Sequence, residues 1–310
     1  MPESNAPAHD QFATVPSGTV ICFREHGDPE DPALLLLAGL GEDLTFWPDS
    51  MINSLVGRGF RVIAVDNRDV GQSSFATTPA PSLWRQVLAR PRGDAYSLSD
   101  MARDAVGVLE QLGIGQVHLV GRSMGAMIAQ TIAATQPERV LSLTSIYSTT
   151  GARKSGRPAL STMALLVAPQ PRNRTAAVRA HLKITRHIAG AAYPIDDAAE
   201  AAIAARGWDR SSGDIGAGVA RQIQAIQRSG DRTAQLRQIT APTLVINGDR
   251  DLMVDPSGGA ATAATIPSAQ HVVIPGMGHH LPESLVSPIT EYVAQHAARV
   301  SEGGSNVEVS

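Results

Sequence analysis

The sequence predicts an α/β fold, a mostly parallel sheet flanked by helices, with a helical segment inserted into it. Short apolar runs alternate with helix patterns over most of the 310 residues, but the alternation stops between about residues 150 and 238. The chain is 43% hydrophobic and 18% charged, which suits a large folded core. We therefore expect a core of residues 1–149 and 239–300, a helical cap of residues 150–238, and a loose tail of residues 301–310.

Seven short runs have the composition of strands. They are nearly continuous in apolar residues and are bounded by Gly, Pro or Asp, as is typical of a parallel sheet covered on both faces. The runs are Thr19–Phe23, Ala33–Leu37, Arg61–Val65, Gln116–Val120, Leu141–Tyr147, Thr243–Ile246 and His271–Ile274.

Helical patterns lie between these runs. Ser97 or Ser99 can cap a helix from about Asp100 to Leu112, whose apolar residues recur every three or four positions. A second helix begins just after Ser123 and stops before a proline. The inserted segment is rich in Ala and Arg, and three helices are predicted in it: Thr175–Ile188, Asp197–Arg206 and Ile215–Arg228.

Composition narrows the classes of function. The net charge of −3 gives no electrostatic reason to expect a nucleic acid partner. No apolar run approaches the roughly 20 residues of a membrane span, and the first ten residues do not resemble a secretory signal. Cys22 is the only cysteine, so no intramolecular disulfide or thiolate cluster can form. These features predict a cytoplasmic protein; its oligomeric state stays open.

Charge is unevenly distributed along the chain. Residues 150–240 contain 14 Arg or Lys against 6 Asp or Glu, which leaves the rest of the chain acidic. A solvated helical face is one interpretation of this basic segment, and a surface that binds anionic substrates is the alternative.

The segment Gly121-Arg122-Ser123-Met124-Gly125 carries the strongest chemical signal. It stands between a predicted strand and a predicted helix, the context in which Gly-x-Ser-x-Gly forms a sharp turn that exposes the serine hydroxyl. The helix that follows would place its positive N-terminal end beneath that hydroxyl. Ser123 is therefore the predicted nucleophile.

A serine nucleophile needs a base and a group that orients the base. His279 lies in a glycine-rich loop after the last predicted strand, and the adjacent His280 is its rival. For the acid, the strand Thr243–Ile246 leads into a turn that contains Asp249 and Asp251, and the residues alone leave both open. The order serine, acid, histidine differs from the chymotrypsin and subtilisin orders.

Two backbone N–H groups are expected to stabilise the oxyanion. Met124 follows the nucleophile and supplies one, and Leu40, in the Gly-Leu-Gly turn after the strand Ala33–Leu37, supplies the other. Trp47 and Met127 are candidate substrate-pocket residues, with a place in the core as the alternative.

Four landmarks resemble the α/β-hydrolase superfamily over about residues 15–297. Two positions depart from the usual pattern: Ala38 replaces a histidine and Asp69 replaces a glycine. Both variants are similar to carboxylesterases of the aclacinomycin methylesterase type. The landmarks are Gly121–Gly125, Asp66–Ser73, Tyr96–Ala102 and Pro275–His279.

The resemblance implies a serine hydrolase of small or medium carboxylic esters that needs no cofactor or metal. It also implies Asp251 rather than Asp249 as the acid. Substrate choice does not transfer, because similarity is poor in the cap. Carbon–carbon bond or lactone hydrolysis on the same triad is the alternative, and a non-catalytic ligand-binding protein is a more distant one.

Overall fold

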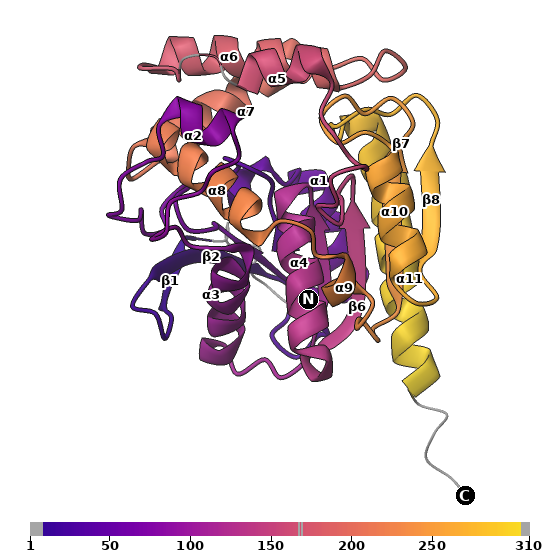
Figure 1. Cartoon of the computed structure of the whole chain (residues 1–310). Helices are drawn as coiled ribbons and strands as arrows, with labels where there is room; N and C mark the ends of the chain where they lie inside the picture. Colours follow the sequence, from indigo (N-terminus) through magenta and orange to yellow (C-terminus); the bar gives the residue numbers. More distant parts are fainter. Residues whose placement is uncertain (1–8, 167, 169, 305–310) are drawn as a thin grey trace, which may run out of the picture.

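An eight-stranded sheet with helices on both faces forms the centre of the molecule (Figure 1). The computed structural model describes residues 9–166, 168 and 170–304. The strand order is β1-β2-β4-β3-β5-β6-β7-β8, antiparallel where β2 pairs with β1 and β4 and parallel elsewhere. The predicted α/β class is confirmed. The strands are β1 (Gln11–Thr14), β2 (Val20–His26), β3 (Ala33–Leu37), β4 (Arg61–Val65), β5 (Val117–Arg122), β6 (Val140–Ile146), β7 (Thr243–Gly248) and β8 (Gln270–Ile274).

Strand β1 was not predicted from the sequence. It lies at the edge of the sheet and only Ala13 of its four residues is buried, so it lacks the continuous apolar run of an inner strand. Strand β2 extends three residues beyond the predicted Phe23, to His26, because its last residues pair with β4.

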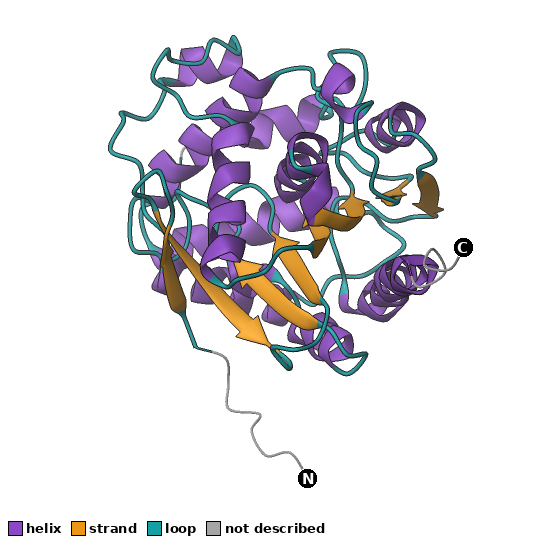
Figure 2. Ribbon diagram, turned by 90° about the horizontal axis from the view of Figure 1, so that it is seen from below, coloured by secondary structure: helices purple, strands orange, loops and turns teal. Residues whose placement is uncertain are grey.

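Alternate residues of the inner strands enter two apolar layers. In β3, Leu35 and Leu37 pack with helices α3 (Leu98–Gln111) and α4 (Met124–Thr135). Leu34 and Leu36 pack on the opposite face with α1 (Asp49–Val56) and α11 (Glu283–Gly304). Figure 2 shows the twisted sheet between these helices. Burial on both faces explains why the strands appear as unbroken apolar runs in the sequence.

The helices on the sheet include the two that were predicted there. Ser97, rather than Ser99, caps α3 through a capping box with Asp100, and α4 begins directly after Ser123. The helices outside the inserted segment are α1 (Asp49–Val56), α2 (Leu83–Val87), α3 (Leu98–Gln111), α4 (Met124–Thr135), α10 (Ser257–Thr265) and α11 (Glu283–Gly304), with short 3₁₀ turns at Leu44–Phe46 and Pro137–Arg139.

Within the described residues, five helices lie between β6 and β7 in the sequence, where the helical insertion was expected. Figure 1 shows α5 and α6 crossing above the sheet. Helix α7 ends at Arg210, later than the predicted Arg206. Gly207 lies inside the helix, and a Cβ there would lie 3.0 Å from the Phe46 ring. The helices are α5 (Leu160–Leu166), α6 (Arg174–Ile188), α7 (Asp197–Arg210), α8 (Ile215–Ser229) and α9 (Thr233–Leu236).

Helix α11 ends the described part of the chain. It continues to Gly304, so the loose tail expected from residue 301 does not begin there; residues 305–310 of that tail lie outside the described residues. None of the helices in the described ranges combines the length and apolar character needed to cross a membrane.

Candidate active site

Ser123 occupies a sharp turn between β5 and α4, with φ of 53° and ψ of −120°. The glycines on either side are required by close packing. A Cβ at Gly125 would lie 2.0 Å from the carbonyl oxygen of Leu37, and one at Gly121 would lie 2.5 Å from the amide of Ala126. The Ser123 amide donates to the carbonyl of Ile146 over 2.9 Å. The surrounding backbone therefore holds the serine in a conformation that non-glycine residues rarely adopt.

The structure brings His279 and Asp251 to this serine. His279 Nε2 lies 2.9 Å from Ser123 Oγ, and His279 Nδ1 lies 2.7 Å from Asp251 Oδ2. Each residue follows a different parallel strand, β5, β7 or β8, so the three meet at the carboxyl edge of the sheet. Asp251 and His279 are both buried.

Both oxygens of the Asp251 carboxylate have hydrogen-bond partners. Oδ2 contacts the imidazole, while Oδ1 accepts from the amides of Met253 and Val254 at 2.7 and 2.8 Å. Asp249 instead accepts from the Gly276 amide at 2.6 Å, and 42% of its side chain is exposed. The structure therefore places Asp251, and not Asp249, against the histidine.

Two other histidines, His280 and His118, have different partners. His280 Nε2 lies 3.2 Å from Glu200 Oε1, on helix α7, and His280 has no contact with Ser123 among the described interactions. His118 is only 1% exposed, and its Nδ1 lies 2.8 Å from Ser142 Oγ. Burial, with a smaller effect of His296, lowers the pKa of His118 to about 4, so this imidazole is neutral at pH 7. His118 is therefore a core histidine of strand β5.

The loop after β3 lies directly beside the nucleophile. A Cβ at Gly39 would come within 3.5 Å of Ser123 Cβ, and the Gly39 amide donates to Glu42 Oε2 over 2.7 Å. Leu40 is the next residue of this loop. Met124 is the first residue of α4, whose leading N–H groups have no acceptor within the helix. The assignment of Leu40 and Met124 to an oxyanion hole stays a prediction.

Arg122 connects the nucleophile turn to this loop. Its guanidinium lies 2.8 Å from Glu42 Oε2 and stacks over the Trp47 ring at 5.1 Å. Burial alone would lower the pKa of Arg122, but the Glu42 carboxylate and the Tyr147 hydroxyl hold that pKa above its usual value. Arg122 therefore joins the nucleophile turn to the loop after β3 through its ion pair with Glu42.

Glu42 and Tyr147 were not singled out in the sequence. The Tyr147 ring packs 4.5 Å from that of His279. Tyr147 is the first residue after strand β6, and Glu42 follows the predicted oxyanion turn. Both residues follow the ends of predicted strands at the functional edge of the sheet, and this position in the sequence could have identified them as site residues.

The two candidate pocket residues are buried. Trp47 is 1% exposed in the apolar layer of α1 and α11, and Met127 is 7% exposed in the layer of α3 and α4. Their role in a substrate pocket stays a prediction.

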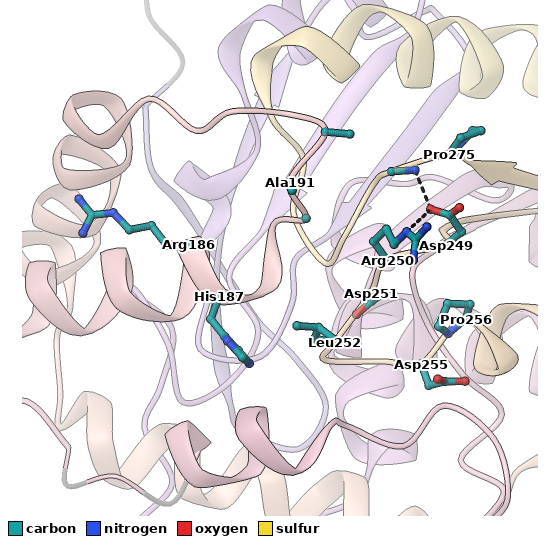
Figure 3. A pocket seen from close by; sticks show the side chains of 13 residues that line it. Arg186, His187, Ala191, Asp249, Arg250, Asp251, Leu252, Asp255, Pro256 and Pro275 are labelled. Carbon is teal, nitrogen blue, oxygen red and sulfur yellow. Dashed lines mark hydrogen bonds and ion pairs between the residues drawn. The ribbon is translucent and has the colours of Figure 1, made fainter.

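A groove of about 1,060 Å³ lies next to Asp251 (Figure 3). Asp251 reaches it, but neither Ser123 nor His279 lines it. Its walls come from the end of α6 with His187, from the loop after α6 with Ala191, and from the turns after β7 and β8 with Asp249 and Pro275. This groove therefore does not hold the reacting atoms. Within the described residues, no group of three or more His, Cys, Asp or Glu could hold a metal ion.

Comparison with known proteins identifies the family of this chain. The sequence profile of the alpha/beta hydrolase fold family matches residues 32–284, which is most of the chain. The chain belongs to this family. Members of the alpha/beta hydrolase fold family similar to it include the rhodomycin D methylesterase of Streptomyces sp. strain C5, which is 29% identical over 87% of this chain and 92% of that protein.

Solved structures share the fold. The enol-lactonase of Burkholderia xenovorans superposes with a TM-score of 0.71 at 23% identity and covers 93% of this chain and 100% of its own. A thermophilic esterase of Thermogutta terrifontis gives a TM-score of 0.68 at 22% identity, covering 94% and 99%. At these identities the likeness establishes the alpha/beta hydrolase fold alone.

Proposed function

We propose that this protein is a serine hydrolase of carboxylic esters, with Ser123, His279 and Asp251 as its catalytic triad. The observation that carries the proposal is the continuous hydrogen-bonded chain from Ser123 Oγ through both nitrogens of His279 to Asp251. A serine–histidine–aspartate chain at a strained strand-to-helix turn is the arrangement that activates a hydroxyl as a nucleophile. Family membership and the methylesterase relative support the same chemistry.

In the proposed mechanism, Ser123 Oγ attacks the carbonyl carbon of the ester while His279 Nε2 takes the hydroxyl proton. Asp251 accepts from Nδ1–H and so keeps Nε2 free to act as the base. The amides of Leu40 and Met124 stabilise the oxyanion. His279 then protonates the departing alcohol, and water, activated by the same imidazole, attacks the acyl-enzyme to release the acid and restore Ser123.

We further propose that residues 150–238 form a cap over a core of residues 1–149 and 239–300. The position of helices α5 to α9 between β6 and β7 supports this division. The substrate is a small or medium ester bound between cap and core, where Trp47 and Met127 could line its walls. The methylesterase relative makes a small alcohol a reasonable leaving group to test.

The test is hydrolysis of p-nitrophenyl esters from acetate to palmitate, together with methyl esters of aromatic acids. Ser123→Ala should lower kcat/KM by at least about 10³-fold. The matched control is Ser287→Ala, at an exposed position of α11, which should keep wild-type rates. Retention of more than a few per cent of the activity in Ser123→Ala would refute the mechanism. No activity on any ester would favour lactone or carbon–carbon bond hydrolysis.

A further inference from the structure

The loop that carries His279 runs from β8 to α11, and the inserted helices hold it from one side. The amides of Gly278 and His279 donate to the carbonyls of Ala189 and Ile188, at the end of α6, over 3.0 and 2.7 Å. On the other side, the Gly276 amide donates to Asp249. The base is therefore positioned jointly by the core and by the insertion.

Glycines allow the two backbones to touch. A Cβ at Gly278 would lie 2.0 Å from the carbonyl oxygen of Ile188, and one at Gly276 would lie 2.3 Å from Ala192 Cβ. A Cβ at Gly190 would meet the carbonyl oxygen of Gly276 at 2.6 Å. The contact between loop and insertion is thus a direct backbone-to-backbone fit, in which a small shift of the insertion would be transmitted to the loop.

Glu200 of helix α7 adds a side-chain link to this contact. The residue is 8% exposed, and its carboxylate has two histidine partners: His280 Nε2 lies 3.2 Å from Oε1, and His181 Nε2 lies 2.7 Å from Oε2. His181 belongs to α6, and its ring makes a T-shaped contact with the Phe46 ring of the core, with the ring centroids 5.7 Å apart. One carboxylate therefore joins α6, α7 and the residue next to His279.

We propose that Glu200 and His280 are positioning residues, which fix the loop so that His279 stays aligned with Ser123. The inference rests on the proposed function, because it assigns a role relative to the His279 base. Burial would raise the pKa of Glu200, but the hydrogen bonds from His181 and His280 outweigh it and lower that pKa to about 2. Glu200 is thus an ionised acceptor at every physiological pH. Of the two adjacent histidines, His279 acts on the serine and His280 anchors the loop.

Catalysis depends on the alignment of His279 with its two partners. His279 must keep both the 2.9 Å contact with Ser123 and the 2.7 Å contact with Asp251, and a displacement of about 1 Å can cost on the order of 10²-fold in rate. Loss of the Glu200–His280 bond should therefore slow the reaction of Ser123 while substrate binding changes little.

The experiment measures the second-order rate at which a fluorophosphonate probe labels Ser123 in the full chain, which needs no knowledge of the natural ester. His280→Leu removes the donor, and His280→Gln keeps an N–H at the same distance from the backbone. We expect His280→Leu and Glu200→Leu to label about 10-fold more slowly than wild type, and His280→Gln to stay within about threefold of wild type. With the best ester, the same loss should fall on kcat rather than on KM.

The matched control is His187→Leu, which removes a histidine of α6 whose Nε2 lies near Thr162 and Ser161, within the insertion. It should label at the wild-type rate. The double variant Glu200→Leu/His280→Leu should be no slower than Glu200→Leu alone, because the bond between Glu200 and His280 is already absent in that single variant. Glu200→Leu tests the contact from the opposite side should His280→Leu fail to fold, as judged by circular dichroism.

Equal labelling rates for wild type and the leucine variants would overturn the proposal, and so would His280→Gln as slow as His280→Leu. Failure of the wild type itself to label would refute the nucleophile assignment and this inference with it. The failure of the proposed function is thereby distinguished from the failure of the positioning role.

Discussion

Asp69 of the core and Arg221 of the inserted helix α8 form a buried bidentate ion pair. Arg221 Nη2 and Nε lie 2.6 and 2.9 Å from the two oxygens of the Asp69 carboxylate, which also accepts from the Tyr96 hydroxyl at 2.8 Å. Asp69 has a φ of 70°, a backbone conformation that favours glycine. In this chain an aspartate takes that strained position and ties the insertion to the core.

Arg221→Met should destabilise the fold, because it leaves the Asp69 carboxylate buried without its charge partner. We expect a loss of about 3 kcal/mol in the free energy of unfolding, measured by urea denaturation. Adding Asp69→Asn should recover part of that loss, since it removes the unpaired charge.

The control for this prediction is Arg174→Met. Its ion pair with Asp209 lies at the surface, with more than half of each side chain exposed, so it should contribute less than about 1 kcal/mol. Equal losses for Arg221→Met and Arg174→Met would contradict the importance of the buried pair.

Asp251→Asn should lower kcat by about 10³- to 10⁴-fold with little change in KM, because an amide cannot hold the imidazole in the required tautomer. The matched variant is Asp249→Asn, whose side chain contacts Gly276 and not the imidazole. It should keep activity within about tenfold of wild type. Steady-state kinetics of both variants on one ester measures these effects. A larger loss of kcat in Asp249→Asn than in Asp251→Asn would reverse the assignment of the acid.

Glu42→Gln should slow catalysis by about tenfold through the loop beside the nucleophile. One carboxylate oxygen accepts from both the Gly39 amide and Arg122, and a neutral amide oxygen would be a weaker partner for a buried guanidinium. The loss should appear in kcat. Glu25→Gln is the control, since Glu25 pairs with Arg61 on strand β4. Unchanged kcat in Glu42→Gln would show that the loop holds its shape without this charge.

The sequence was most informative where chemistry and local structure coincide. The strand–Gly-x-Ser-x-Gly–helix segment required both glycines for backbone packing, so it identified the turn and its serine together. The choice between Asp249 and Asp251 could not be made from residues alone, because the two differ only in whether the turn points the side chain to His279 or to Gly276.

Interactions between segments far apart in the sequence leave no local pattern, so they could not be predicted from it. The basic insertion was interpreted chiefly as a solvated face, but Arg221 and Arg232 are buried and Arg210 makes ion pairs with core carboxylates, among them Asp66 at 2.7 Å. Part of the positive charge of the insertion therefore neutralises the acidic core. Glu200 likewise has no feature in the sequence that distinguishes it from other helical glutamates, and only the fold brings two histidines beside it.

His118 should make the fold less stable in acid. Its pKa is about 4 in the folded protein because of burial, against about 6.5 when unfolded, so between those values the unfolded chain binds the additional proton. The stability that the neutral imidazole allows is complete above pH 6.5 and is lost as pH falls toward 4, by at most about 3 kcal/mol. His118→Asn keeps a polar group near Ser142 but does not titrate. Urea denaturation of both proteins at pH 7 and pH 4.5 should show a smaller acid loss in the variant, and parallel losses would mean that His118 is not protonated on unfolding in this range.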